Sequence, residues 1–254
     1  MKVKKSNYNY ISVITFLLTL VPSIASAAIT GNDLEQFFSS SSMTSRLLQI
    51  FMMITIIGLA PSILIMVTSF VRISIVLSIV RTALGLQQSP PNQVMVALAM
   101  FLTFFIMSPA LEESYEQGLR PMLDERITEE EAMPIIAQPF KRFMVNNTRE
   151  KELNLFISIA KVDAPKKAEE LQFLPLKVIV PSFMISELRR GFEIGFLVFL
   201  PFLIIDIVVS SILMAMGMMM MPPVMVALPF KIIFFVLIDG WYLLAGSLVQ
   251  SFAT

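Results

Sequence analysis

Three long stretches of this sequence contain no charged residue, and they constrain the fold more than any other feature. They run from Leu47 to Val71, from Thr82 to Leu111 and from Ile207 to Phe230. A helix needs about 20 predominantly apolar residues to cross the hydrocarbon core of a bilayer. Only 15% of the residues are charged and 56% are hydrophobic, which is a poor composition for the surface of a soluble domain. The sequence therefore predicts an all-α, polytopic membrane protein.

The first 27 residues have the pattern of a secretory signal peptide. A lysine-rich start precedes the apolar run Ile11 to Leu20, and a small-residue A-x-A site ends at Ala27. This order of basic, apolar and small residues is typical of a cleaved signal, and we expect cleavage between Ala27 and Ala28. The alternative is an uncleaved first anchor, which Pro22 and the short apolar run disfavour.

The mature sequence alternates between apolar and polar segments. We expect about four long hydrophobic helical segments, with a kink or a break at Pro61 in the first of them. Charges in the polar middle recur at three and four spacing, which favours helices there. The predicted parts are a signal peptide (1–27), a polar N-terminal segment (28–46), a first hydrophobic hairpin (47–111), a hydrophilic, periplasmic insert (112–180), and a second hydrophobic hairpin with a Met-rich loop (181–254).

Charge placement gives the expected orientation of these segments. If the signal is cleaved, the mature chain starts on the periplasmic side, and each span then changes the side. The linker that holds Arg72 and Arg81 would therefore lie in the cytoplasm, and the insert would lie in the periplasm. Basic residues on the cytoplasmic side agree with the positive-inside rule.

The most unusual segment runs from Met214 to Met225, where seven of twelve residues are methionine. Methionine has three flexible torsions and a soft thioether, so it fills irregular space and rearranges easily. Such loops from several copies of the chain could close a pore against ions and still let a polypeptide pass. The alternative is a lipid-facing or packed hairpin tip that happens to be rich in methionine.

Charged residues inside apolar stretches form a second group. Asp206, Lys231 and Asp239 sit among aliphatic and aromatic neighbours, where a charge is costly unless it is paired or faces water. They suggest either a proton or ion relay, or ion pairs such as Lys231 with Asp206. We favour ion pairing, because a proton pathway needs a more continuous polar line.

A third group is the charged segment from Ser186 to Glu193. On one helix, Glu187 would neighbour Arg190 at i,i+3, and Arg189 would neighbour Glu193 at i,i+4. The segment is either a surface feature or a contact with partner chains.

The residue types that are missing bear on catalysis. The chain has no histidine and no cysteine, which removes the commonest general base, the thiol nucleophile and the usual zinc ligands. No glycine-rich phosphate-binding motif is present. Nineteen basic residues balance nineteen acidic ones, which gives no basic surplus for binding nucleic acid. We therefore expect no enzyme, no metal or other cofactor and no nucleic-acid partner.

Several long motifs resemble the FliP proteins of flagellar type III export and their SctR relatives in virulence injectisomes. The signal peptide and length are similar to the flagellar branch. The motifs that carry the resemblance lie at Arg72–Gly85, Pro91–Pro109, Pro181–Phe196, Pro201–Met218 and Leu228–Trp241.

The resemblance implies a core subunit of the flagellar export gate, a channel for unfolded flagellar proteins across the bacterial inner membrane. It implies a pentameric core with FliQ and FliR in the basal body, with many helices lifted out of the bilayer plane. It places a channel gasket at Met218, Met219 and Met220, with Met221 adjoining. It also implies subunit contacts at Glu187, Asp206 and Lys231. We expect Arg190 and Asp239 to be subunit contacts or buried charges as well.

Two other classes of function compete with the gated pore. An ion-coupled secondary transporter would use Asp206, Lys231 and Asp239 as a relay, but such transporters often show internal repeats, and this sequence shows no convincing one. A membrane enzyme ranks third, because no nucleophile motif is present.

Overall fold

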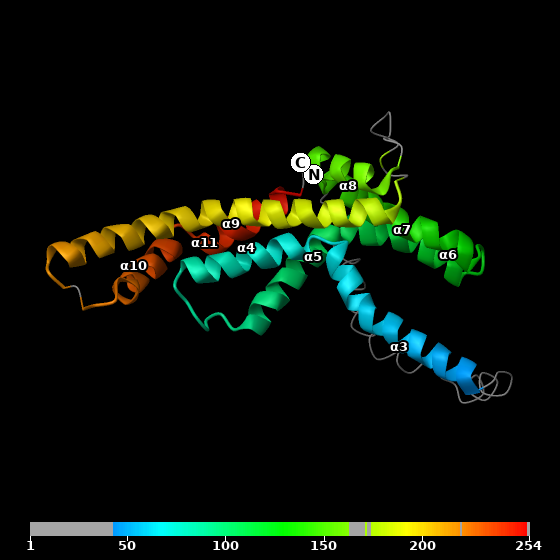
Figure 1. The fold of residues 1–254 in the computed structure, drawn as a ribbon, viewed down its shortest axis with the longest axis horizontal. Coiled ribbons are helices and arrows are strands. Elements are labelled where there is room, and N and C mark those ends of the chain that lie inside the picture. The colour runs from blue at the N-terminus through cyan, green and yellow to red at the C-terminus, as the bar shows by residue number, and fades with distance from the viewer. Residues whose placement is uncertain (1–42, 163–170, 172–173, 219, 253–254) are drawn as a thin grey trace, which may run out of the picture. The chain divides into compact units, whose positions relative to one another are not determined.

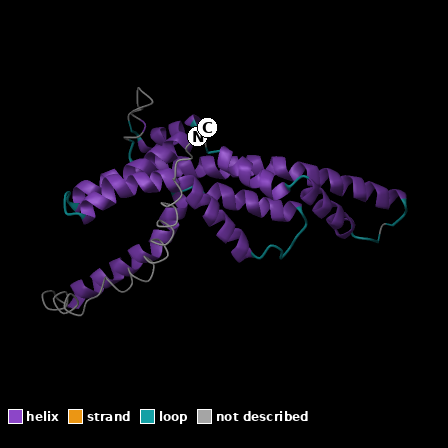
Figure 2. Cartoon of the chain, turned by 180° about the vertical axis from the view of Figure 1, so that it is seen from behind, coloured by secondary structure: helices purple, strands orange, loops and turns teal. Residues whose placement is uncertain are grey.

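The computed structural model describes residues 43–162, 171, 174–218 and 220–252. The expected cleavage site at Ala27 and Ala28 and the loop residue Met219 lie outside these ranges. Every regular element in the described ranges is a helix (Figure 2). The predicted all-α fold is therefore confirmed, whereas the predicted division into five parts stays a prediction.

The chain divides into two compact units, Met1–Ala60 and Pro61–Thr254. Helix α3 (Met43–Met66) begins in the first unit, and its apolar side chains are exposed along its length. Of the two outcomes expected at Pro61, a break into two helices is wrong, because the helix continues through it to Met66, whereas a kink stays a prediction. A proline removes one intrahelical hydrogen bond, and membrane helices tolerate that loss.

The second unit contains the remaining helices (Figure 1). They are α4 (Phe70–Ala83), α5 (Asn92–Ser114), the π-helical turn η1 (Tyr115–Leu119), α6 (Arg120–Leu123), α7 (Glu129–Asn147), α8 (Glu150–Ala160), α9 (Leu176–Ala215), α10 (Pro223–Leu237) and α11 (Gly240–Gln250).

Two of these helices differ from the predicted spans. Helix α9 has 40 residues and begins at Leu176, five residues before the predicted second hairpin (181–254). The last span is broken, because α10 and α11 meet at an angle of 63° next to Asp239. Asp239 adopts the left-handed conformation, with φ at 52°, which an α-helix does not continue through.

Three helical segments of the described chain are long and apolar enough to cross a membrane, and the bent pair α10–α11 makes a possible fourth. The three are Leu47–Met66, Asn92–Leu123 and Leu176–Ala215. Their length and hydropathy match what the sequence predicts for a polytopic membrane protein.

The larger hydrophobic core of the second unit forms around α4, which lies alongside α9 and α11 in Figure 1. Ile73, Val76, Leu77 and Val80 are completely or almost completely buried there. Side chains of α5, α9, α10 and α11 pack against them. Helix α4 was expected to be a linker, but its apolar residues recur at helical spacing and the helix forms the centre of this core.

A smaller core joins the insert to the first half of α9. Met144 of α7, together with Leu153 and Ile157 of α8, packs on Ile179 and Phe183 of α9. The prediction of helices in the insert is confirmed, and these helices lie against α9.

A capping box starts α7. The side chain of Thr128 accepts a hydrogen bond from the backbone N–H of Glu131, and the Glu131 carboxylate accepts one from the backbone N–H of Thr128. This backbone bond favours the charged carboxylate and lowers the pKa of Glu131. The box satisfies two N–H groups that the helix end would leave without a partner.

Two glycines on one face of α9 allow α4 to approach closely. A Cβ atom at Gly191 would lie 3.3 Å from the Cβ of Ile75, and one at Gly195 would lie 3.2 Å from the Cβ of Ile79. The two pairs share a four-residue spacing, as in the small-xxx-small contacts of membrane helices. An isoleucine Cβ cannot rotate away, so a larger residue would push the helices apart.

The double substitution Gly191→Ala and Gly195→Ala is therefore expected to destabilise the chain by about 1–3 kcal/mol, as overpacking does. The control is Gly246→Ala in α11, where a Cβ would meet no atom within 4 Å. Alanine there is expected to stabilise the helix by up to about 1 kcal/mol. Thermal unfolding in detergent measures both, and equal midpoints would contradict the close contact.

Candidate functional site

The methionine-rich segment forms the tip of the hairpin between α9 and α10. Helix α9 ends in a Schellman motif: the N–H of Gly217 donates to the carbonyl of Met214, and the N–H of Met218 donates to that of Leu213. Gly217 has φ at 74°, a conformation that costs glycine little. Pro222 and Pro223 then start α10. The chain therefore reverses direction over a short loop, and we call Met218–Met221 the methionine loop.

The described side chains of this loop are exposed. Met220 is 99% exposed, Met218 44% and Met221 48%. The flanking methionines are exposed as well: Met214, Met216 and Met225. An apolar side chain that stands free of its own chain is available to contact another surface. This geometry fits both a channel gasket and a lipid-facing tip, so the gasket stays a prediction.

A buried lysine joins the two arms of this hairpin to the end of α4. The Nζ of Lys231 in α10 donates to the carboxylate of Asp206 in α9 at 2.6 Å and to the carbonyl of Ala83 at 2.9 Å. Ala83 is the last residue of α4, where an unpaired carbonyl and the helix dipole attract a cation. The predicted pairing of Lys231 with Asp206 is confirmed, and it fixes the hairpin against the core.

Asp239 is not part of this cluster. It is exposed, it precedes α11 in the left-handed conformation, and no ion pair to Lys231 is seen in the described part of the chain. The geometry thus does not bring the three residues of the hypothetical relay together. The relay stays an untested alternative, and of its three residues only Asp206 and Lys231 are in contact.

The central buried charge pair joins Arg72 of α4 to Glu187 of α9, and both side chains are fully buried. The guanidinium pairs with the carboxylate through two nitrogens, Nη2 with Oε1 and Nε with Oε2, the latter at 3.0 Å. This arrangement corrects two expectations. Arg72 does not face solvent in a linker, and the partner of Glu187 is Arg72 and not Arg190.

The third nitrogen of Arg72 binds the segment after α11. Nη1 donates to the carbonyl and the hydroxyl of Ser251, each at 3.0 Å. The ring of Phe252 lies 3.6 Å from the guanidinium carbon, and Phe143 of α7 stacks on that ring. Sequence reasoning missed this junction. The sequence did contain a signal for it, because Arg72 lies in an apolar stretch. An arginine that is buried there requires a buried acceptor.

The remaining charges of the segment Ser186–Glu193 lie nearer the surface. Arg189 pairs with Glu193 at 2.9 Å, as the sequence predicts, and Arg149, the residue before α8, joins them at 3.1 Å. Arg190 is half-buried, and no hydrogen bond or ion pair of its side chain is seen within the described ranges. This leaves Arg190 as a candidate for contact with another chain.

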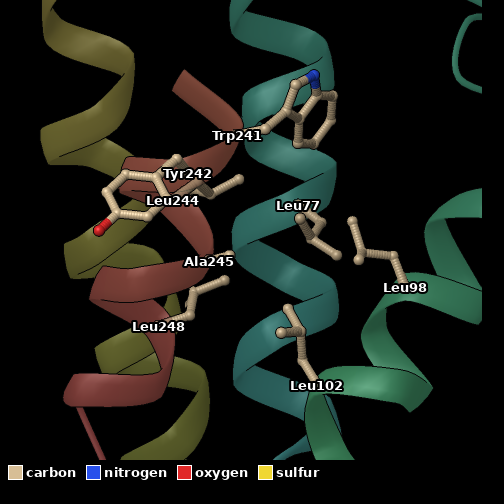
Figure 3. A pocket seen from close by; sticks show the side chains of 8 residues that line it. All are labelled: Leu77, Leu98, Leu102, Trp241, Tyr242, Leu244, Ala245 and Leu248. Atoms are coloured by element: carbon tan, nitrogen blue, oxygen red, sulfur yellow. The ribbon is translucent and has the colours of Figure 1, made fainter. Parts of the chain in front are cut away.

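An apolar hollow of about 380 Å³ lies between α4, α5 and α11 (Figure 3). Its wall is made by Leu77, Leu98, Leu102, Trp241, Tyr242, Leu244, Ala245 and Leu248. These side chains are almost all hydrocarbon, apart from the indole nitrogen of Trp241 and the hydroxyl of Tyr242.

Removal of the Glu187 carboxylate is expected to destabilise the fold strongly. Glu187→Ala leaves Arg72 buried without its counter-ion, which costs about 3–5 kcal/mol. The matched control is Glu193→Ala on the same helix, where the carboxylate is 52% exposed and its surface pairs contribute about 0–1 kcal/mol. Thermal unfolding in detergent measures both, and equal losses would refute the central role of the buried pair.

Comparison with known proteins places the chain in a family. A family model described as the FliP family matches residues 53–248. Three relatives bear the name flagellar biosynthetic protein FliP. That of Caulobacter vibrioides is 52% identical (84% of this chain, 79% of the relative), that of Bacillus subtilis 52% (87% and 100%), and that of Agrobacterium fabrum 46% (94% and 100%). The chain therefore belongs to the FliP family.

Proposed function

We propose that this chain is a core subunit of the flagellar type III protein export gate in the bacterial inner membrane. Its family and its apolar helices make it a membrane-embedded protein of flagellar export and assembly. The finer proposal is that several copies surround a channel through which unfolded flagellar proteins cross. The chain carries out no chemistry and holds no cofactor in this role, so the driving energy comes from other components.

One observation carries the proposal: an apolar side chain, Met220, is 99% exposed at the tip of a hairpin. Folding of a single chain gains nothing from leaving this side chain free, because the hydrophobic effect favours its burial. If loops from neighbouring copies meet on an axis, each thioether packs against the others. The methionine loop would then form the channel gasket.

The rest of the hairpin suits a gate that must yield locally. Lys231 holds the arms α9 and α10 to the carbonyl end of α4, so the base of the hairpin is fixed. The tip consists of flexible, unbranched side chains, which can move aside for a polypeptide and close again. A rigid base with a soft tip lets substrate through without disassembly of the ring.

The proposed partners are further copies of the chain in a pentameric core, together with FliQ, FliR and other basal body components. Large apolar side chains remain exposed on the second unit and can be covered by lipid or by neighbouring subunits. Examples are Phe196, Leu197, Ile204, Val236 and Leu237. Half-buried Arg190 is a candidate partner for a carboxylate of a neighbouring subunit.

Shortening the gasket tests the proposal. Replacing Met218, Met219 and Met220 with alanine removes the thioethers, so the assembled gate is expected to conduct small ions while retaining some export. Ion flux through liposomes that contain the purified assembly measures the leak. The control is Met133→Ala, which shortens an exposed methionine of α7. Unchanged flux in the triple variant, with assembly intact by gel filtration, would refute the gasket.

A further inference from the structure

The apolar hollow between α4, α5 and α11 differs from one end to the other (Figure 3). Its middle is made by leucines, and Leu77 of α4 points toward Leu98 of α5. Trp241 stands at one end with its indole nitrogen on the side away from these leucines, and the hydroxyl of Tyr242 points away from them as well. The volume of about 380 Å³ lies in the range of about 300–1,000 Å³ that small-molecule sites occupy. The hollow therefore offers room for a molecule that is apolar along its length and polar at one end.

The bend between α10 and α11 sets the position of Trp241. Its ring lies edge-on to that of Phe235 in α10, with ring centroids 5.3 Å apart. A Cβ atom at Gly240 would lie 2.2 Å from the Phe235 ring, so a glycine there makes room for this packing. Trp241 is 41% exposed, and no hydrogen bond of its indole N–H is seen among the described residues. A tryptophan of this kind, with an apolar body and a free N–H, is typical of the headgroup level of a membrane.

Two charged residues of opposite sign lie toward the same end of the hollow. Arg81 follows Leu77 by four residues, so the two share a face of α4. The beginning of α4 binds Ser251 at the end of α11, so the end of α4 that holds Arg81 lies where α11 begins. Asp239 immediately precedes α11 and is the only charged residue within 232–254. Neither side chain makes an ion pair in the part of the chain that the structure describes.

We propose that the hollow binds a phospholipid with an ammonium headgroup, whose acyl chain lies on the leucines and whose headgroup lies between Arg81, Trp241 and Asp239. The guanidinium of Arg81 binds the phosphate, and the indole N–H donates to an oxygen of the headgroup. The carboxylate of Asp239 pairs with the ammonium, which the face of an indole also attracts. The two charges that the chain leaves unpaired thus match the two charges of one lipid.

A lipid fits this site better than a side chain of a neighbouring subunit does. Helix α5 and the bent pair α10–α11 are long and apolar enough to cross a membrane, so lipid is the medium around them. A neighbouring chain would need an apolar group, an anion and a cation at three separate points, whereas a phospholipid carries all three in this order. The site is independent of the gasket, because the methionine loop lies at the other end of α10.

The first measurement tests the headgroup. The assembled complex is reconstituted with equal amounts of phosphatidylethanolamine and phosphatidylglycerol, and native mass spectrometry identifies the lipids that stay bound after extraction. Phosphatidylethanolamine is expected to be retained preferentially, because phosphatidylglycerol has no ammonium. Equal retention of the two lipids by the unsubstituted complex would overturn the proposal.

The matched variant for this measurement is Asp239→Asn. Asparagine tolerates the left-handed conformation of this residue but carries no charge, so the preference for phosphatidylethanolamine is expected to fall about fivefold. The control is Glu129→Gln, which neutralises an exposed carboxylate of α7 and is expected to leave the preference unchanged. An unchanged preference in the Asp239 variant would contradict the assigned headgroup contact.

The second measurement locates the acyl chain. A phosphatidylethanolamine with a photoreactive diazirine in its tail is added to the complex in liposomes, and irradiation is expected to label the α5 peptide that contains Leu98 and Leu102. Ala245→Phe fills the hollow from its wall and is expected to reduce this labelling about tenfold. The matched control is Leu243→Phe, which enlarges an exposed side chain of the same helix and is expected to leave the labelling unchanged.

Two results of this measurement would overturn the proposal. If Ala245→Phe leaves the labelling unchanged, the acyl chain does not occupy the hollow. If Ala245→Phe prevents assembly by gel filtration and Leu243→Phe does not, a neighbouring subunit fills the hollow in place of a lipid. The headgroup measurement leaves the wall of the hollow intact, so it decides the proposal even where the Ala245 variant does not fold.

Discussion

The buried pair of Arg72 and Glu187 is the interaction on which the arrangement of the second unit depends. Two full charges without access to water must be matched in geometry as well as in sign, so the pair fixes the rotation and the axial register of α4 against α9. In this register, Gly191 and Gly195 of α9 lie against Ile75 and Ile79 of α4. The same guanidinium binds Ser251 and stacks on Phe252, which ties the end of α11 to this position.

From this fixed centre, α9 runs on to the hairpin tip at Ala215. Lys231 makes the last described charged contact before the loop, where it joins α9, α10 and the end of α4. Beyond it most side chains are apolar and exposed, although Leu213 and Ala227 are buried. Large apolar side chains are thus exposed around this hairpin, which is stable where lipid or further protein replaces water.

Sequence patterns predicted the helices, the apolar spans and the pair of Lys231 with Asp206, because each depends on local spacing or on the cost of a charge in an apolar stretch. The same reasoning missed the partner of Glu187. Arg190 is three residues away on the same helix, whereas Arg72 is distant in sequence, and only tertiary packing brings it near. The predicted second hairpin (181–254) begins five residues after the observed start of α9 at Leu176.

The central claim is that methionine loops from neighbouring copies meet. Because the chain has no cysteine, Met220→Cys introduces a single thiol, and a disulfide between two copies requires Cα atoms about 4.4–6.8 Å apart. Mild oxidation of the assembled complex in membranes, followed by non-reducing electrophoresis, measures this proximity. The account predicts covalent dimers of the chain. Persistence of monomers, while a maleimide still labels the same thiol, would show that the loops do not meet.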